Sequence, residues 1–449
     1  MYACVVPPIE KCLKMSGDGI VVGVNAQKLA DLFLQEYPTV CVLESKEILT
    51  YVKGRYICNG AELIHQSLVQ GLAPYVKVDG KSAYNSYLYR EVIDIIRGMT
   101  YKKEEDIDKD LDVINVQNGL LNWKTMTIEP HRSNYISRIQ HPIVYDPDAK
   151  CPAIEKIFKM VLREEDYEKA LEFIGYCFYR SYKKIQQYFI LYGPGGTGKS
   201  AFIDIICNLI GHENVSSTTM HDLENDRFAT SDLHNKCLNQ CGDMAQTTLP
   251  NVNVLKMATS GKDVLRTQRK GKQAFDFVNF AKFIFATNKL PLVKDDTTGF
   301  YRRVELLIFD HIIKDDEKDA DLLAQAATPE ELSGLLNLVL PHIWILLERG
   351  TFSNGFKPNE TKLKYKAASD PIGTFEEVCI KEEAGVFATK EDVYNTYVSF
   401  CKKNDIEPLN ASWFGREFAK KIAYWKQSGS EVIAGKPKTI WKNMRLTQP

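Results

Sequence analysis

The chain has 449 residues, too many for a single hydrophobic core, so its length predicts roughly two to four domains. Its composition, 44% hydrophobic and 26% charged, is ordinary for a soluble globular protein, and its 11 cysteines show no paired zinc-ligand spacing. A formal net charge of −1 excludes a uniformly basic surface, so any nucleic-acid contact must come from local patches. No run approaches the ~20 apolar residues of a membrane span, which predicts no membrane partner.

Residues 1–150 are expected to form an N-terminal domain of mixed α+β structure. Leucines at helical spacing predict a helix over 26–36, and a second helix is expected over 61–70. Pro147 and Pro152 bias the residues before them toward extended backbone. They therefore predict a connector and a domain boundary near residue 150.

The segment 151–310 opens with helical sequence and then alternates strand-like and helix-like runs, which predicts an α/β core. The stretch G-P-G-G-T-G-K-S follows a short apolar run and precedes a helix-like run, the context of a phosphate-binding loop. Lys199 would bridge the β- and γ-phosphates of ATP, and Ser200 would hold Mg²⁺. The candidate ATP ligands are Gly193, Pro194, Gly195, Gly196, Thr197, Gly198, Lys199 and Ser200.

Three polar sites follow the phosphate loop along the chain. Asp243 ends a mostly apolar run and is the candidate acid for Mg²⁺ and water, while Asn288 ends a second run and could contact water and phosphate. Arg302 and Arg303 are adjacent cations just before another apolar run. One such residue alone is usually a turn residue. Three such sites in order after a phosphate loop predict a hydrolytic site instead.

Between Asp243 and Asn288, residues 261–277 predict two strands around a basic turn. Its tip carries Arg269, Lys270 and Lys272. One interpretation is a hairpin whose charges attract nucleic-acid phosphates without reading sequence. The other is a solvated turn, and these residues alone leave both open.

A helical extension and linker are expected over 311–370. Thr328 predicts a helix cap, with Pro329 in the first turn, and Pro341 is expected to kink or split the apolar helix that follows. Glycine, proline and asparagine predict a linker over 350–364.

The segment 371–449 is expected to form a last small domain. It contains an amphipathic helix over 391–403, a second helix over 413–422 and a hairpin with a basic turn over 431–441. Over residues 387–449, 11 lysines and arginines stand against 6 acidic residues, a net charge of +5. This order predicts a winged-helix-like DNA-binding domain that contacts phosphates, and a merely solvated hairpin is the alternative.

The phosphate loop, the strand that ends in Asp243, the basic hairpin and K-F-I-F-A-T-N-K-L-P at 282–291 together resemble a superfamily 3 helicase. The closer similarity is to the helicase part of phage- and plasmid-type primase-helicases, which also resembles the poxvirus primase-helicase. Residues 116–121 and 141–152 resemble that family's domain ahead of the ATPase, and the C-terminal module resembles its winged-helix-like tail. The resemblance covers roughly residues 25–445.

The resemblance implies a P-loop, AAA+-like core that forms a hexameric ring, with ATP bound between subunits and single-stranded DNA in the central pore. Asp243 matches the Walker B acid and Asn288 matches the first sensor. Arg302 or Arg303 matches an arginine finger that reaches a neighbour's ATP. Lys270 and Lys272 match the pore hairpin.

Two features depart from the family pattern. Gly242 stands where a second acid often precedes the Walker B acid, so Asp243 serves both Mg²⁺ and water alone or another acid contributes. The region ahead of the ATPase lacks a credible acid constellation for a primase. We therefore expect a helicase without primase activity, working beside a separate primase or polymerase.

The leading hypothesis is an ATP- and Mg²⁺-dependent DNA helicase, a homo-oligomer that acts on single-stranded or forked DNA during replication of a virus, plasmid or mobile element. It would be cytoplasmic, in the host cytosol if viral. The alternative is an ATP-regulated ring that melts or loads at an origin without processive unwinding. A small-molecule P-loop kinase explains neither the basic hairpin nor the C-terminal domain.

Overall fold

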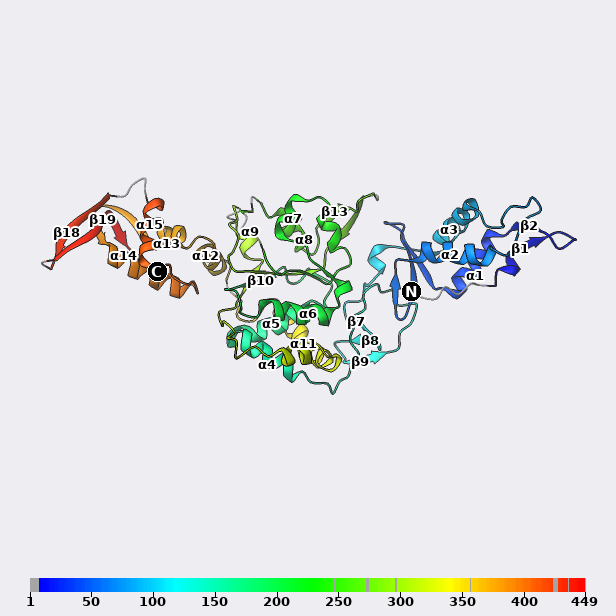
Figure 1. Cartoon of the computed structure of the whole chain (residues 1–449), viewed down its shortest axis with the longest axis horizontal. Coiled ribbons are helices and arrows are strands. Elements are labelled where there is room, and N and C mark those ends of the chain that lie inside the picture. Colours follow the sequence, from blue (N-terminus) through cyan, green and yellow to red (C-terminus); the bar gives the residue numbers. More distant parts are fainter. Residues whose placement is uncertain are drawn as a thin grey trace.

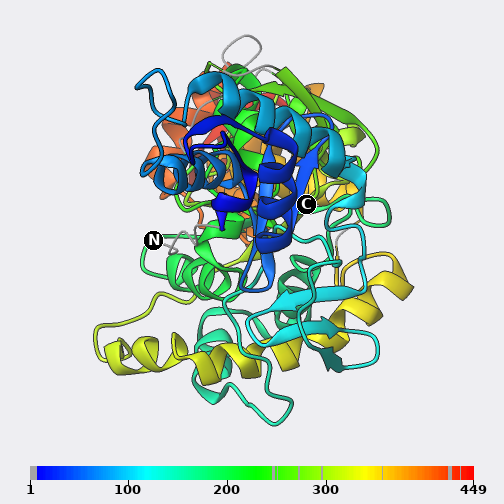
Figure 2. The same ribbon diagram turned by 90° about the vertical axis from the view of Figure 1, so that its right-hand side faces the viewer.

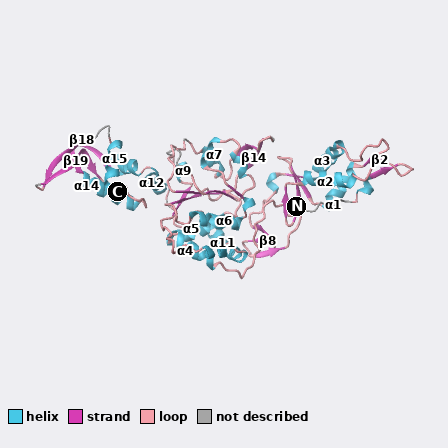
Figure 3. Ribbon diagram, viewed as in Figure 1, coloured by secondary structure: helices cyan, strands magenta, loops and turns pink. Residues whose placement is uncertain are grey.

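The chain folds into three parts that follow one another in a row (Figure 1). The computed structural model describes residues 8–244, 248–249, 251–271, 274–294, 297–355, 357–422, 427–434 and 436–448. One hydrophobic cluster spans Ile9 to Ile96, a large central one spans Ile114 to Tyr365, and a third lies between Ala367 and Met444. Figure 2 looks at the N-terminal part end-on, and Figure 3 shows helices and strands in every part.

In the N-terminal part, helices pack beside small sheets. The helices are α1 (Ala26–Glu36), α2 (Gly60–Leu72) and α3 (Ser86–Thr100). The strands are β1 (Leu13–Met15), β2 (Val21–Val24), β3 (Thr39–Val42), β4 (Ile48–Val52), β5 (Arg55–Ile57) and β6 (Tyr101–Lys102). β1 pairs with β2, and the other four form a sheet in the order β5–β4–β3–β6. The helices expected over 26–36 and 61–70 are confirmed.

A parallel sheet is the centre of the molecule, and its order is β11–β12–β15–β10–β16. Its strands are β10 (Tyr188–Tyr192), β11 (Val215–Ser216), β12 (Leu238–Cys241), β15 (Lys282–Thr287) and β16 (Val304–Ile308). The mixed α/β architecture with a parallel sheet is confirmed. Because β10 lies between two strands that come later in the chain, the sheet has a topological switch point beside it, where α/β proteins bind ligands.

Helices cover both faces of this sheet (Figure 1). On one face lie α4 (Pro152–Val161), α5 (Glu164–Tyr176), α6 (Lys199–Ile210) and α11 (Pro329–Arg349). On the other lie α7 (Met220–Asn225), α8 (Asn253–Ala258) and α9 (Thr298–Tyr301). An antiparallel sheet of β7 (Val113–Val116), β8 (Gly119–Asn122) and β9 (Thr127–Glu129) precedes them, and its apolar side chains join the central cluster. The boundary expected near residue 150 therefore lies inside that cluster.

Helix α11 is long and apolar enough to cross a membrane by length and composition alone, although half of the relevant window is buried inside the protein. It packs against α5 as a core helix. A Cβ on Gly175 of α5 would lie 2.7 Å from the Val339 carbonyl oxygen, so glycine permits the close crossing. The helix runs unbroken through Pro341, so of the two expected outcomes, a kink or a split, the split is wrong.

The linker expected over 350–364 is wrong from residue 358 onward. There α12 (Pro358–Ser369) begins, after the shorter α10 (Ala320–Ala326) and α11. The Tyr365 side chain of α12 is buried in the central cluster, and its hydroxyl donates to the Pro291 carbonyl at 3.0 Å. Long-range burial thus stabilises a helix in a segment whose local composition favours a loop.

In the C-terminal part, α13 (Pro371–Cys379) and β17 (Ile380–Thr389) precede α14 (Lys390–Lys403) and α15 (Ala411–Lys421). Strands β18 (Gln427–Ile433) and β19 (Lys436–Leu446) then form an antiparallel hairpin, and the sheet order is β17–β19–β18. The two helices and the basic hairpin expected from the sequence are confirmed. The apolar face of α14 is the predicted one, with Val393, Tyr397, Phe400 and Cys401 buried.

Glu305, a buried carboxyl on β16, predicts a specific pH dependence of stability. Its Oε1 accepts from Gln187 Nε2 at 2.6 Å, and its Oε2 has no hydrogen-bond partner among the described residues. Burial raises the Glu305 pKa from 4.5 to about 7, although the nearby charge of Lys169 opposes this. The folded protein therefore holds an extra proton between these pH values, and the free energy of unfolding falls as pH rises through them, by roughly 3 kcal/mol for this group.

Urea unfolding at pH 5 and pH 7 measures this effect. Glu305→Gln should flatten the pH dependence, because the amide keeps the shape of the carboxyl and does not titrate. Asp94→Asn, on an exposed face of α3, should leave the slope unchanged. An equal slope in wild type and Glu305→Gln would contradict the assignment.

Candidate nucleotide and nucleic-acid sites

The phosphate loop connects β10 to the N-terminus of α6. Gly198 has a φ of +84°, which favours glycine, and any Cβ on Gly193 would collide with the Phe309 carbonyl oxygen. The Ile313 N–H donates to the Gly196 carbonyl at 2.9 Å, so the segment after β16 also holds the loop. The first N–H groups of α6 have no partner within the helix, and they add partial positive charge at the loop.

Lys199 is buried and folds back over its own loop. Its Nζ donates to the carbonyls of Gly193 at 2.8 Å and Pro194 at 2.7 Å, and to Thr197 Oγ1 at 3.3 Å. Burial lowers the Lys199 pKa, while the charge of Asp243 opposes the shift. These contacts hold an ammonium group where an anion's oxygens could replace the carbonyls.

Asp243 and Asn288 lie at the same edge of the sheet as the phosphate loop. Both are exposed, and they follow β12 and β15, which run parallel to β10. The Gly193 N–H donates to the Thr287 carbonyl at 3.3 Å, which ties the loop to the strand that ends beside Asn288. Ser200, in the first turn of α6, is exposed too. An ammonium, a hydroxyl, a carboxylate and an amide therefore meet at one edge.

Sequence reasoning missed a second carboxylate near this edge. Burial raises the pKa of the Cys241 thiol at the end of β12, and the charges of Asp243 and Asp222 both add to the shift. Asp222 lies on α7, which follows β11 at this same edge of the sheet, and its Oδ2 accepts from Thr219 Oγ1 at 2.7 Å. The sequence did not mark Asp222 as a site residue, because acidic residues are common in the first turn of any helix.

The structure distinguishes Arg302 from Arg303. Arg303 is buried, its Nη1 donates to the Gly299 carbonyl at 2.6 Å, and burial lowers its pKa. Arg302 is exposed. Both precede β16, whose first residue pairs with Tyr188 at the start of β10. A strand of five residues spans about 16 Å, so this pair lies at the opposite edge of the sheet from its own phosphate loop.

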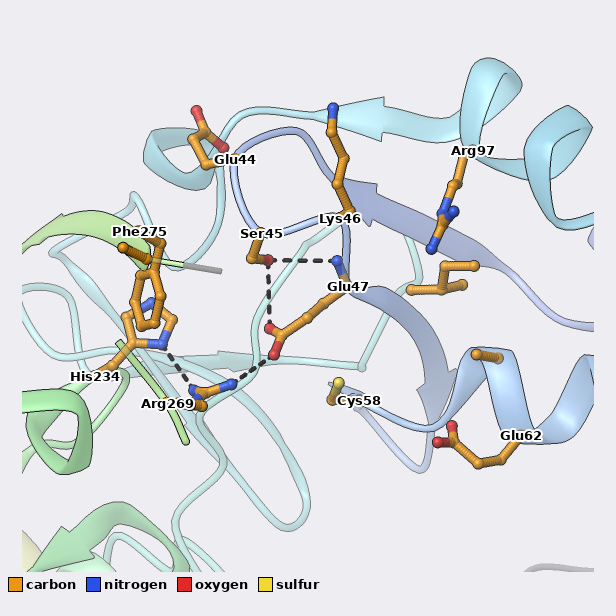
Figure 4. A pocket seen from close by; sticks show the side chains of 13 residues that line it. Glu44, Ser45, Lys46, Glu47, Cys58, Glu62, Arg97, His234, Arg269 and Phe275 are labelled. Atoms are coloured by element: carbon orange, nitrogen blue, oxygen red, sulfur yellow. Dashed lines mark hydrogen bonds and ion pairs between the residues drawn. The ribbon is translucent and has the colours of Figure 1, made fainter. Parts of the chain in front are cut away.

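The expected basic hairpin is confirmed as β13 (Val264–Gln268) paired antiparallel with β14 (Ala274–Val278). Lys270 is exposed at its turn, and Lys272 lies outside the described residues. Arg269 instead turns toward the N-terminal part (Figure 4), where its Nη1 lies 2.6 Å from Glu47 Oε1. Its Nη2 lies 3.2 Å from His234 Nδ1, and its guanidinium lies over the Phe275 ring.

A second set of contacts joins the N-terminal and central parts beside Arg269. His234 Nε2 lies 3.1 Å from Glu104 Oε1, and Arg138 makes two bonds to the same carboxylate, at 2.8 and 2.9 Å. Although burial opposes it, these bonds lower the Glu104 pKa to about 2. Arg269, His234 and Glu47 also line a cavity of about 380 Å³ (Figure 4). Sequence reasoning could not find these pairs, because Glu47 and Arg269 lie 222 residues apart.

Three family models match the chain. "D5 N terminal like" matches residues 30–163, "Family of unknown function (DUF5906)" matches 191–303, and "Poxvirus D5 protein-like" matches 367–443. The central match runs from the end of β10 to Arg303 and so contains the phosphate loop, Asp243, the hairpin and Asn288. The two D5 matches flank it in chain order.

An α/β core with a five-stranded parallel sheet between two D5-like regions is what the fold and the family matches define. Two regions of the chain therefore match D5-like models of the phage and poxvirus primase-helicase type, as the sequence resemblance indicated. These D5-like matches point to a replication-associated protein of the helicase or primase type.

Two solved apo structures of the NrS-1 C terminal region are similar to the chain. One, of residues 305–718, has 13% identity and a TM-score of 0.45, and the match covers 93% of this chain and 99% of that one. An A form has 12% identity and a TM-score of 0.43, with 92% and 98% covered. No curated protein matches the sequence.

The burial of Arg303 predicts that the two adjacent arginines differ in their effect on stability. Arg303→Ala should lower the free energy of unfolding by about 1–2 kcal/mol, because it removes a bond to the Gly299 carbonyl and buried packing. Arg302→Ala should change it by less than about 0.5 kcal/mol, as is usual for an exposed site. Urea unfolding of both variants checks this, and equal losses would contradict the distinction.

Proposed function

We propose that this chain is an ATP-dependent DNA helicase that works as a hexameric ring on single-stranded or forked DNA during replication of a virus, plasmid or mobile element. The observation that carries the proposal is the meeting of Lys199, Asp243 and Asn288 at one sheet edge, with exposed Arg302 at the other. The first three residues supply a phosphate cation, an acid and a polar sensor. The fourth is displayed to a neighbour.

The residues at the loop fit ATP with Mg²⁺. Lys199 offers a cation for phosphate oxygens, while the Ser200 hydroxyl and the Asp243 carboxylate are oxygen ligands of the kind Mg²⁺ takes. Bound there, Mg²⁺ would neutralise charge on the β- and γ-phosphates.

Hydrolysis needs a base or orienting group for water and a cation for the transition state. Asn288 and the carboxylates of Asp243 and Asp222 are the candidates for orienting water. Within one subunit, Arg302 faces away from this edge, so the cation would come from the neighbouring subunit of an AAA+-like ring. This arrangement supports the proposed oligomer, because each site is incomplete alone.

Nucleotide state would reach the hairpin through α7 and α8. Asp222 lies on α7 near the nucleotide edge, and Glu224 of the same helix caps α8, accepting from the N–H groups of Val254 at 3.2 Å and Leu255 at 2.9 Å. Helix α8 leads within a few residues into β13. A shift of α7 on hydrolysis would therefore move the hairpin, whose turn carries Lys270, and with it a DNA phosphate.

In the C-terminal part, the order α13, β17, α14, α15 and the β18–β19 hairpin supports a winged-helix-like domain that binds DNA. A separate primase or polymerase would be the replication partner, and the site of action would be the cytoplasm, in the host cytosol for a virus.

Lys199→Ala tests the nucleotide site. Because it removes the only side-chain cation of the loop, ATP binding should weaken roughly 10- to 100-fold, the value of a charge-assisted bond, and DNA-stimulated hydrolysis should be lost. The readouts are nucleotide-binding fluorescence and phosphate release, with exposed Lys183→Ala as matched control.

Mixing Lys199→Ala with Arg302→Ala subunits should restore part of the hydrolysis, since mixed interfaces pair an intact loop with an intact arginine.

Unwinding of a forked duplex by the wild-type protein decides between helicase and loading ring. DNA-stimulated hydrolysis without strand separation would favour the ring that loads or melts an origin. Full hydrolysis by Lys199→Ala would overturn the nucleotide site itself.

Glu47→Gln tests whether the hairpin binds DNA through Arg269. The neutral amide would release the guanidinium for a phosphate, so affinity for single-stranded DNA should rise about three- to tenfold at low salt, with a steeper salt dependence. Fluorescence anisotropy with a labelled oligonucleotide measures this. Glu62→Gln, which lines the same cavity, is the control. If the double variant Glu47→Gln/Arg269→Ala still binds single-stranded DNA more tightly than the wild type, Arg269 is not the residue that binds it.

A further inference from the structure

Helix α15 of the C-terminal part has one buried aromatic face and one exposed face with a different chemistry. Phe414 and Phe418 are buried in the domain core, where their rings stack at 5.2 Å. Trp413 and Arg416 lie on the other side, at the i, i+3 spacing of neighbours on one helix face. The Trp413 side chain is 53% exposed, and the Arg416 guanidinium lies 4.6 Å from its ring centroid.

The position of Trp413 is well defined despite its exposure. Its backbone N–H donates to Asn410 Oδ1 at 2.9 Å, in the cap that starts α15. The buried neighbour Phe414 fixes the rotation of the helix, because it packs face to face against Tyr397 at 4.2 Å. A large ring is thus exposed on a well-packed helix, with a cation over part of it, although burial of an indole is favourable by about 2–3 kcal/mol.

The chemistry of this pair favours an unpaired nucleobase. An indole offers a flat π surface and a single N–H donor, so it is poorly suited to read the edges of paired bases in a groove. Stacking on an aromatic ring requires a base that has left the helix, and arginine beside the ring adds a contact for the phosphate. The basic surroundings, +5 over residues 387–449, complement a phosphate backbone.

We propose that Trp413 and Arg416 form a stacking site for one unpaired base of single-stranded DNA. This inference rests on the proposed function for the identity of DNA as the ligand. It assigns the C-terminal part to the unpaired strand of a fork and not to the duplex ahead of it. The other occupants of such a face, a second copy of the chain or a protein partner, are outcomes that the experiment separates.

The test measures binding of the full chain to a labelled oligothymidine and to the same strand with abasic sites. Trp413→Ala should lose roughly tenfold or more in affinity for the normal strand, the loss of one stacked base, while Trp413→Phe keeps most of it. Abasic sites should weaken the wild type by a similar factor and leave Trp413→Ala nearly unaffected. Arg416→Ala should lower the salt slope by about one.

The control is Trp344→Ala, which removes an equally exposed tryptophan, 52%, from α11 in the central part. It should bind as the wild type does. Indole fluorescence should be quenched by oligothymidine in wild type and in Trp344→Ala, and much less in Trp413→Ala.

Three results would overturn the inference. Unchanged affinity in Trp413→Ala would reject the contact, and equal losses on a blunt duplex and on single strands would assign the face to duplex DNA. If Trp413→Ala changes the oligomer size in sedimentation, and the wild type binds abasic and normal strands equally, the exposed face of α15 instead contacts a second copy of the chain. None of these readouts needs ATP or unwinding. If only the helicase proposal fails, the protein will not separate strands but will still bind normal strands more tightly than abasic ones.

Discussion

The parallel pairing of β10 with both β15 and β16 is the constraint on which the candidate nucleotide site depends. Tyr192 is level with Thr287 on one side and Ile308 on the other, so the phosphate loop leaves the sheet between the residues that follow these strands. The Phe309 N–H donates to the Tyr192 carbonyl at 2.8 Å, and its own carbonyl lies against Gly193. A side chain at that glycine would force the strands apart and shift Lys199 relative to Asn288.

The same pairing explains why the arginines cannot serve their own loop. Parallel strands carry all their carboxyl ends to one edge, so residues just before β16 must lie at the other edge, a strand length away. Arg303 is used there for internal packing, and Arg302 is left exposed. A hydrolytic site that used either of these two arginines would therefore take it from another chain, and this follows from the sheet topology before any ring is assumed.

Much of the site could be predicted from sequence, because Lys199, Asp243 and Asn288 each sit next to the apolar strand that positions them. Features set by long-range contacts could not be predicted. The Glu331 carboxylate, three residues after the Thr328 cap of its own helix, caps α4, accepting from the N–H groups of Ala153 and Ile154. Local composition favoured a linker before Tyr365, because the burial of that side chain depends on strands distant in sequence. Asp222 could not be singled out, because acids are common in the first turn of any helix.

The contacts around Arg269 suggest how the N-terminal part could stay attached while the hairpin moves. Glu47 binds Arg269 on the hairpin. Glu104 binds two residues outside the hairpin, Arg138 and the residue His234 ahead of β12. Arg269 is 35% exposed and Glu47 14%, so a competing phosphate can reach the guanidinium, while Arg138 and His234 are only 9% and 3% exposed. The Arg269–Glu47 pair, whose cation is the more exposed, is therefore the more easily exchanged one. Exchange of Glu47 for a phosphate would free the hairpin and leave the Glu104 contacts in place, so DNA binding and docking of the N-terminal part need not exclude each other.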